Sequence, residues 1–412
     1  MDRNQERMNR EQNRNTEDLK WKYKIDSLVI FRNLRSNLVF SAFASLIGPH
    51  DAEESVRLYG EFAARLFEEG TDDWSGYLLR CVLEDENGYI TRVSAEGGVP
   101  QSLAACLEAE LALLEELARI TSAAVRAGMG YSGFLPDWKT AAIDFASAYR
   151  ERIAGLAKHG WGIFAKHKVF VVEDGALVPV RHPDPQSLVA LYGYEAEREK
   201  VLANTRALLE GRPANNVLLY GDAGTGKSST VKAVANELAD EGLRLIEVKK
   251  NQLYEIADIV ERLSGNPLKF IIFIDDLSFS QNDNDFAALK AILEGSVSAC
   301  GNNIAVYATS NRRHLIKETF SDREGDDVHL YDTMQELMSL SARFGLTITF
   351  SRPEKELYCD IVQKFADLYE IDLEPDKLRV RAEAFAIRNG GRSPRTAKQF
   401  IELMAGGVLP AG

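Results

Sequence analysis

The chain has 412 residues, of which 45% are hydrophobic and 27% charged, a composition typical of globular proteins with two or three domains. It carries 49 Lys and Arg residues against 62 Asp and Glu residues. The resulting net charge of -13 argues against a general nucleic-acid coat protein or a polybasic membrane binder. The four cysteines form no C-x-x-C pair and match no zinc-ligand spacing, which favours reduced thiols. Because the sequence has no run of 18 apolar residues and no apolar leader, we expect a cytoplasmic protein that does not enter a membrane.

The amino-terminal part of the chain is predicted to be mainly helical. Residues 1–20 are polar and predict a flexible tail, or a helix that orders only on a partner. Residues 21–185 predict a helical domain, and its clearest helix covers residues 103–125. Apolar residues recur there at every third or fourth position, which gives one apolar stripe. The stripe consists of Leu107, Leu111, Leu114, Leu117 and Ile120.

Residues 128–133 match the pattern G-x-G-x-x-G, which is found in dinucleotide-binding sites. That motif requires a strand before it and a helix after it. Here a predicted helix precedes the glycines and Phe134-Leu135-Pro136 follows them. We therefore interpret the segment as a helix cap and turn.

The sequence pattern changes between residues 168 and 186. An apolar run at 168–172 predicts a short strand, and residues 175–185 contain three prolines, which favours a linker. We therefore place a domain boundary between residues 185 and 186. Beyond it, runs rich in β-branched residues alternate with helical patterns, which predicts a parallel sheet covered on both faces. The predicted strands are 217–220, 243–248, 270–274, 304–308 and 346–350.

One segment matches the phosphate-binding pattern G-x-x-x-x-G-K-[ST] without deviation, with a predicted strand before it and a predicted helix after it. Its glycines let the backbone approach phosphate oxygens, and the helix N-terminus adds partial positive charge. We expect Lys227 to reach the β and γ phosphates of ATP and Ser228 to hold Mg²⁺. The predicted nucleotide-binding set is Gly221, Asp222, Ala223, Gly224, Thr225, Gly226, Lys227, Ser228 and Ser229.

A second motif is the strand-like run Phe270–Ile274 followed by Asp275 and Asp276. A buried strand that ends in acidic residues places carboxylates at the edge of the sheet where ligands of α/β proteins bind. Asp275 is the candidate second ligand for Mg²⁺. Asp276 is the candidate residue that orients or deprotonates the attacking water.

With these two motifs, residues 188–405 resemble the AAA+ ATPases, and further segments fit that family in its order. The resemblance implies that Tyr194, in Leu191–Glu195, lies beside the adenine. It also implies that Asn311, at the end of Ala308–Asn311, is the sensor 1 residue that polarises the attacking water or contacts the γ phosphate. From the residues alone, Asn311 could also be a plain turn residue.

The same resemblance assigns two arginines. Arg343, in Leu340–Gly345, corresponds to the arginine finger, which a neighbouring subunit supplies, so it implies a homo-oligomer. In Gly391–Ala397 the resemblance implies a sensor 2 arginine in a C-terminal lid. Arg395 is our choice for the residue that faces the nucleotide, with Arg392 as the alternative. Either arginine could otherwise be a surface residue.

A narrower resemblance links residues 211–221 and 275–279 to a bacterial family of AAA+-type ATP-binding proteins of unassigned function, in which a helical region precedes the ATPase module. Two departures from the AAA+ pattern stand out. Most AAA+ proteins have Glu where this chain has Asp276, which is one methylene shorter. The segment Lys249–Tyr254 also lacks the aromatic-apolar-glycine loop of AAA+ unfoldases, so protein threading is disfavoured.

We therefore predict an α/β fold: an AAA+ module with a five-stranded parallel sheet over residues 186–352 and a helical lid over 353–412, preceded by the helical domain. The predicted activity is hydrolysis of ATP to ADP and phosphate with Mg²⁺, coupled to remodelling or assembly of a macromolecular partner. The helical domain is expected to select an unidentified protein partner. The alternatives are a nucleotide-gated binding module with little hydrolysis, and an ATPase similar to DNA-replication initiators or helicase loaders. Nucleic-acid binding remains open, although the acidic charge does not support it.

Overall fold

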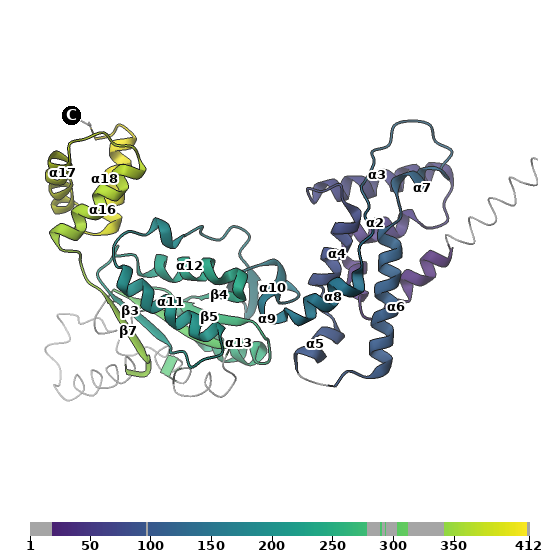
Figure 1. The fold of residues 1–412 in the computed structure, drawn as a ribbon, viewed down its shortest axis with the longest axis horizontal. Helices are drawn as coiled ribbons and strands as arrows, with labels where there is room; N and C mark the ends of the chain where they lie inside the picture. Colours follow the sequence, from purple (N-terminus) through teal and green to yellow (C-terminus); the bar gives the residue numbers. More distant parts are fainter. Residues whose placement is uncertain are drawn as a thin grey trace, which may run out of the picture. The chain divides into compact units, whose positions relative to one another are not determined.

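The structure is a computed structural model, and it describes residues 19–95, 98–277, 289–290, 293, 303–311 and 342–409 (Figure 1). The chain divides into two compact units, Met1–Lys166 and His167–Gly412. Each unit has its own hydrophobic core. Within the described ranges, no helix is both long enough and apolar enough to cross a membrane.

The first unit is helical, as predicted. The long predicted helix is divided, because α6 ends at Ala118 and α7 begins at Ser122. Thr121 causes this break, since its side chain accepts a hydrogen bond from the Ala124 amide and starts a new helix. The elements of the unit are η1 (Arg32–Ser36), α2 (Leu38–Leu46), α3 (Ala52–Glu68), α4 (Trp74–Glu84), α5 (Gly88–Ser94), α6 (Gln101–Ala118), α7 (Ser122–Arg126), α8 (Phe145–Ala154), α9 (Leu156–His159) and α10 (Ile163–Lys166).

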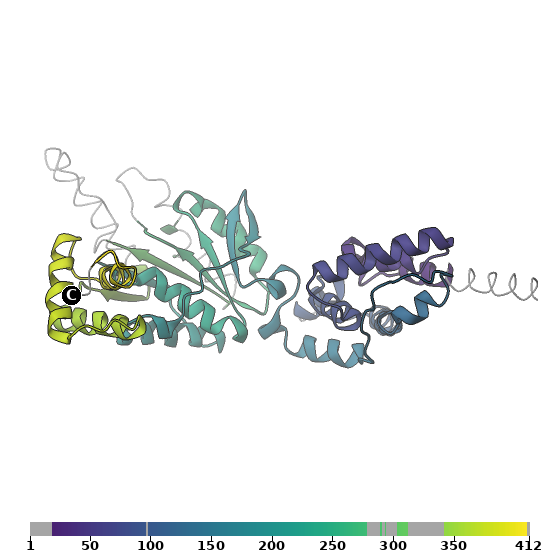
Figure 2. The ribbon, with the colours of Figure 1, turned by 90° about the horizontal axis from the view of Figure 1, so that it is seen from above.

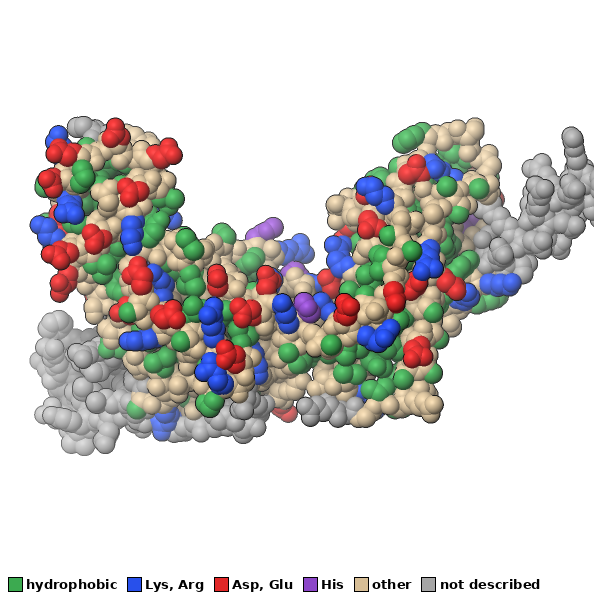
Figure 3. All heavy atoms as spheres, in the orientation of Figure 1, with side chains coloured by type: hydrophobic (Ala, Val, Ile, Leu, Met, Phe, Trp, Pro, Cys, Tyr) green, Lys and Arg blue, Asp and Glu red, His purple; other side chains and the backbone are tan. Residues whose placement is uncertain are grey.

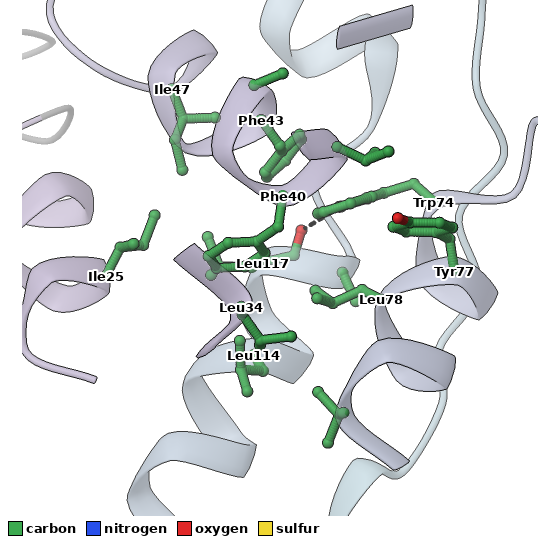
Figure 4. Packing of buried hydrophobic residues seen from close by; sticks show 14 of the residues in the cluster. Ile25, Leu34, Phe40, Phe43, Ile47, Trp74, Tyr77, Leu78, Leu114 and Leu117 are labelled. Carbon is green, nitrogen blue, oxygen red and sulfur yellow. Dashed lines mark hydrogen bonds between the residues drawn. The ribbon is translucent and has the colours of Figure 1, made fainter. Parts of the chain in front are cut away.

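Aromatic and aliphatic side chains pack together in the core of this unit (Figure 4). Phe43 packs on Trp74 and on Phe62, with ring centroids 4.2 and 4.9 Å away. The indole N–H of Trp74 donates to the Leu117 carbonyl at 3.0 Å, so the ring is buried without an unsatisfied donor. The G-x-G-x-x-G segment follows α7 as a turn, with Met129 buried, and no strand precedes it. The interpretation of this segment as a turn is therefore confirmed.

A buried carboxylate fixes the entry of the chain into this core. Glu110 of α6 is 6% exposed, and its two oxygens accept hydrogen bonds from three successive backbone amides. The donors are Val29 at 2.7 Å, Ile30 at 3.2 and 3.1 Å, and Phe31 at 3.0 Å. Because Ile30 and Phe31 are themselves buried, Glu110 satisfies amides that water does not reach.

The second unit is built on a seven-stranded sheet with the order β2-β1-β4-β5-β6-β3-β7. All neighbouring strands are parallel except β1 and β2. The strands are β1 (Val169–Glu173), β2 (Ala176–Pro179), β3 (Val217–Gly221), β4 (Leu243–Val248), β5 (Lys269–Ile274), β6 (Ile304–Ser310) and β7 (Leu346–Phe350). The five predicted strands are all present, and the α/β fold class is confirmed.

Helices cover both faces of this sheet. The apolar residues of α11 (Glu195–Leu209) and α12 (Lys227–Leu238) pack on alternate residues of the strands, and Figures 1 and 2 show these helices along one face. The strand residues in between are also buried, as are four apolar residues of α13 (Ile256–Leu263). The helices and strands of the sheet region are joined in part by three short 3-10 helices: η2 (Leu188–Ala190), η3 (Ala239–Glu241) and η4 (Lys250–Glu255).

The predicted boundary between residues 185 and 186 is wrong, because β1 and β2 belong to the sheet. Phe170 of β1 is fully buried and pairs with Ile246 of β4. Asp174 and Gly175, with φ of 48° and 74°, form the tight turn that joins the two strands. Pro179 is tolerated because β2 lies at the edge of the sheet.

The predicted C-terminal helical lid is present, and its three helices share a core of their own (Figure 2). They are α16 (Lys355–Leu368), α17 (Pro375–Arg388) and α18 (Pro394–Ala405). Ser393 begins α18, since its hydroxyl accepts a hydrogen bond from the Thr396 amide at 3.0 Å. Only residues 351–354 separate β7 from α16, so the lid is joined closely to the sheet.

We predict that Glu110→Gln lowers the free energy of unfolding of the first unit by about 2 to 3 kcal/mol, because one acceptor oxygen becomes a donor that faces backbone amides. Urea unfolding of the full chain, followed by tryptophan fluorescence, measures this unit alone, since Trp21, Trp74, Trp138 and Trp161 all lie in it. Glu108→Gln, on the exposed face of α6, is the matched control. Equal destabilisation by the two variants would contradict the role of Glu110.

Candidate nucleotide-binding site

The phosphate loop connects β3 to α12 and needs glycine at fixed points. Gly221 has φ of 135°, and a Cβ atom there would lie 2.1 Å from the Phe350 carbonyl oxygen of β7. Gly224 and Gly226 also have positive φ, 79° and 94°, which other residues rarely adopt. The loop therefore curves tightly beside the end of β7.

This curvature leaves a row of backbone N–H groups available. Among the described residues, the amides of 223–229 donate to no acceptor, and the first hydrogen bond of α12 runs from the Thr230 amide to the Gly226 carbonyl. Residues 223–229 all line one cavity. Free amides at the positive end of a helix dipole form an anion site.

Lys227 supplies a cation beside these amides. Its side chain is mostly buried, with 6% of the residue exposed, and its Nζ donates to the carbonyls of Gly221 (2.9 Å) and Asp222 (2.8 Å) and to Asn311 Oδ1 (2.9 Å). Burial lowers the pKa of the ammonium group, and the negative charges of Asp222, Asp276 and Asp275 oppose this shift. The ammonium group is thus surrounded by three oxygen acceptors, and the carboxylates lie close by.

Asp275 lies at the end of β5, where two hydroxyl groups reach it. Ser228 Oγ donates to Asp275 Oδ1 at 2.6 Å, and Thr309 Oγ1 donates to the same oxygen at 2.5 Å. The two predicted Mg²⁺ ligands, Ser228 and Asp275, are therefore in direct contact. Sequence reasoning missed Thr309, although it lies in the segment that ends at Asn311.

The donor set fits Mg²⁺. Mg²⁺ prefers oxygen ligands, and in nucleotide sites it is bound by one or two protein groups together with phosphate oxygens and water. Ser228 and Asp275 match that pattern. No group of three or more His, Cys, Asp or Glu residues that could cage a metal ion occurs in the described part of the chain.

Asn311 lies between the cation and the second carboxylate. Its Oδ1 accepts from Lys227, while its Nδ2 donates to Asp276 Oδ1 at 2.7 Å. Asp276 has φ of 52°, and its amide donates to Thr309 Oγ1 at 2.9 Å, which holds this turn in place. Because β5 and β6 are adjacent parallel strands, their ends bring Asp276 and Asn311 together.

These groups line a cavity of about 470 Å³, a volume typical of small-molecule sites. Leu191, Tyr192 and the lid residue Phe365 form an apolar wall, in which the rings of Tyr192 and Phe365 meet edge to face with centroids 4.8 Å apart. Arg395 and Lys398 of α18 add two cations from the lid. The cavity thus combines an apolar side with a phosphate-binding side.

Three predicted nucleotide-binding residues do not line this cavity. The backbone carbonyls of Gly221 and Asp222 hold Lys227 instead. Tyr194 has φ of 61° and turns its ring into the core, where it packs on Phe350 with centroids 5.3 Å apart, and its hydroxyl donates to the Ser351 carbonyl at 2.5 Å. Tyr192 occupies the cavity wall in its place.

The two lid arginines differ clearly. Arg392 donates two hydrogen bonds of 2.8 Å to the Glu383 carboxylate, so its guanidinium is engaged within the lid. Arg395 lines the cavity, and its backbone amide donates to the Gly224 carbonyl at 3.2 Å. This geometry favours Arg395 over Arg392 as the residue facing the ligand.

Arg343 is remote from the cavity of its own chain. Of the predicted finger segment, residues 340 and 341 lie outside the described residues, and Arg343 precedes β7. The strands β7 and β3 are parallel, with Leu346 opposite Val217 and Phe350 opposite Gly221. Arg343 therefore lies near the amino-terminal ends of these strands, whereas the phosphate loop follows the carboxyl end of β3. The strand between them spans about 13 Å.

Comparison with known proteins places the second unit in a family. Residues 165–408, more than half of the chain, match the family described as "Protein of unknown function (DUF815)". The Holliday junction branch migration complex subunit RuvB of Salinibacter ruber is 24% identical over 220 residues, 53% of this chain and 59% of that protein. The Replication factor C large subunit of Sulfolobus acidocaldarius is 31% identical over 116 residues, 27% of this chain and 26% of that protein.

Among solved structures, the AMPPCP-bound DnaA of Aquifex aeolicus is similar at 15% identity and a TM-score of 0.36, over 54% of this chain and 65% of that one. The chain spans less than two thirds of the length of each of these three proteins. The chain belongs to the DUF815 family of proteins of unknown function, within the AAA+ superfamily of nucleotide-binding ATPases.

Proposed function

We propose that the second unit binds ATP with Mg²⁺ and hydrolyses it to ADP and phosphate, and that this cycle drives remodelling or assembly of a macromolecular partner. The observation that carries the proposal is that three groups lie together at one phosphate loop: a cation, two candidate Mg²⁺ ligands, and a carboxylate with its amide partner that could activate water. These are Lys227, Ser228 with Asp275, and Asp276 with Asn311.

In the proposed complex, the free amides of residues 223–229 and the Lys227 ammonium hold the phosphates. Lys227 already points to the carbonyls of Gly221 and Asp222, so a phosphate oxygen can replace one of these acceptors. Ser228 and Asp275 would hold Mg²⁺, which neutralises phosphate charge and orients the phosphate chain when bound.

Asp276 is suited to activate the attacking water. Asn311 fixes one of its carboxylate oxygens at 2.7 Å, and the other has no donor among the residues described. That second oxygen can accept the proton of a water aligned with the γ phosphate. Because Asn311 also binds Lys227, the water-activating carboxylate and the phosphate-binding cation are held at a set separation.

We propose that Arg343 acts in the site of a neighbouring subunit. Its place near the amino-terminal ends of β7 and β3, away from its own phosphate loop, supports this assignment. A guanidinium inserted from a second copy would stabilise charge on the γ phosphate, while Arg395 and Lys398 close the site from the lid. The active form is then a homo-oligomer.

The alternative of a nucleotide-gated module with little hydrolysis rests on the length of one side chain. Asp276 is one methylene shorter than the usual Glu, so its carboxylate reaches less far toward the γ phosphate. In that case ATP would select an assembly state without being consumed. The rate of phosphate release distinguishes the two functions.

A role on DNA is the second candidate, favoured by the names of two relatives, which refer to Holliday junctions and to replication. On the face drawn in Figure 3, the acidic and basic side chains of the described residues are interspersed and form no continuous basic area. The net charge of -13 also disfavours it. We therefore propose a protein partner, selected by the helical unit. Salt-dependent binding of DNA would instead support the second candidate.

We predict that Lys227→Ala weakens binding of a fluorescent ATP analogue by at least about tenfold, because a charge-assisted hydrogen bond to phosphate is lost. Lys232→Ala is the matched control, since Lys232 lies on the same helix and pairs with Glu247 at 2.9 Å outside the cavity. Unchanged affinity in Lys227→Ala would remove the basis for the proposed site.

We predict that Asp276→Asn retains ATP binding but lowers phosphate release by about 100-fold or more, because an amide does not accept the proton of the water. Asp258→Asn, on α13 outside the cavity, should hydrolyse ATP like the wild type. If the wild type releases phosphate no faster than Lys227→Ala, the chain is the gated module and not an ATPase.

For Arg343, we predict that Arg343→Ala lowers phosphate release by at least about 100-fold, whereas exposed Arg388→Ala does not. An equimolar mixture of Arg343→Ala and Lys227→Ala subunits should regain about one quarter of wild-type activity. In random oligomers, a site with its own Lys227 meets a neighbour with Arg343 at that frequency. A mixture that remains inactive would contradict action between subunits.

A further inference from the structure

The short segment that joins β7 to the lid is bonded directly to the phosphate loop. The Asp222 amide donates to the Phe350 carbonyl at 3.1 Å, and the Asp222 carboxylate accepts from the Arg352 amide at 3.0 Å. A residue of the phosphate loop is therefore held on both sides by the linker. A shift of Asp222 must move the linker, or break these bonds.

The side chain of Arg352 extends this connection to the lid. Its Nη2 donates to the Gly390 carbonyl at 3.2 Å, in the loop between α17 and α18, and lies 3.9 Å from Asp222 Oδ1. Both charged side chains are about half exposed, so their attraction alone contributes little. The hydrogen bond to the Gly390 carbonyl therefore carries the connection from Asp222 through Arg352 to the lid loop.

The guanidinium of Arg352 lies against the lid loop at Gly391. Gly391 has φ of 104°, and a Cβ atom there would lie 2.5 Å from Arg352 Nη1. Gly390 also has a positive φ, 83°, but a Cβ atom there would meet nothing within 4 Å. Only Gly391 therefore combines backbone strain with a space that Arg352 occupies.

The same lid loop continues into Ser393 and Arg395, which contact the phosphate loop. Ser393 and Arg395 lie against Gly224, where a Cβ atom would be 3.0 Å from Ser393 Oγ, and the Arg395 amide donates to the Gly224 carbonyl. Arg352 thus contacts the lid a few residues before the segment that closes the cavity.

Tyr194 gives the linker a third support. Its hydroxyl holds the Ser351 carbonyl, next to Arg352, and its ring packs on Phe350. With Asp222 on one side and Tyr194 on the other, residues 350–352 have a fixed path, and Arg352 is aimed at the lid loop.

We propose that Arg352 is a positioning residue that couples the phosphate loop to the lid: through Asp222 it senses the position of the loop, and through Gly390 and Gly391 it sets the position of Arg395. It contacts no nucleotide in this account. The coupling to nucleotide rests on the proposed ATP site, whereas the contact between linker and lid does not.

Hydrogen–deuterium exchange of the full chain, read in peptides covering residues 389–396, tests the contact without nucleotide. We expect Arg352→Ala and Gly391→Ala to exchange about three- to tenfold faster there than the wild type, with α16 unchanged. Gly390→Ala, which has the same kind of backbone strain but no clash with Arg352, should stay within about twofold. Equal exchange in Gly390→Ala and Gly391→Ala, or faster exchange throughout the lid, would overturn the proposal.

A second arm adds the non-hydrolysable analogue adenylyl imidodiphosphate with Mg²⁺. We expect slower exchange at residues 389–396 in the wild type, and loss of that protection in Arg352→Ala while the analogue still binds. Protection that persists in Arg352→Ala would overturn the coupling. If the analogue does not bind the wild type, the proposed function fails, and the nucleotide-free comparison still decides the contact. Should Arg352→Ala fail to fold, the two glycine variants decide it.

Discussion

The nucleotide module depends on the hydrogen bonds that hold the buried ammonium group of Lys227. Lys227 is almost fully buried, which disfavours its charge, so the surrounding structure has to supply acceptors. Two backbone carbonyls and Asn311 do so, and the carboxylates of Asp275 and Asp276 lie near enough to oppose the effect of burial. The ends of β3, β5 and β6 supply these groups, so the order of strands in the sheet determines the chemistry of the site.

The same loop connects to the lid as well as to the sheet. Asp222 provides one of the carbonyls that hold Lys227, while its amide and carboxylate bind the linker after β7. A ligand that draws Lys227 away from the Asp222 carbonyl therefore acts on a residue that also holds Arg352. This arrangement gives a physical route from phosphate binding to a change in the lid.

The features that could be predicted from the sequence are those that depend on residues close together in the chain. The phosphate loop, the acidic strand end and the strands β3 to β7 follow from spacing and from runs of apolar residues, and the structure has them. Tyr194 could not be placed in this way, because the direction of its ring depends on a positive φ at a single residue. Residues 175–185 were interpreted as a linker because they contain three prolines, although β2 lies among them and Asp174-Gly175 is a turn signal. The contact of Arg352 with Gly390 joins residues 38 positions apart and has no sequence signature.

The most direct test of the account is a crystal structure of the full chain with adenylyl imidodiphosphate and Mg²⁺. We predict that the γ phosphate lies within hydrogen-bond distance of Lys227 Nζ, with Mg²⁺ on Ser228 and Asp275. At least one of the bonds from Lys227 to the carbonyls of Gly221 and Asp222 should be exchanged for a phosphate oxygen. An analogue bound elsewhere, or bound here while Lys227 keeps all three of its present acceptors, would contradict the account.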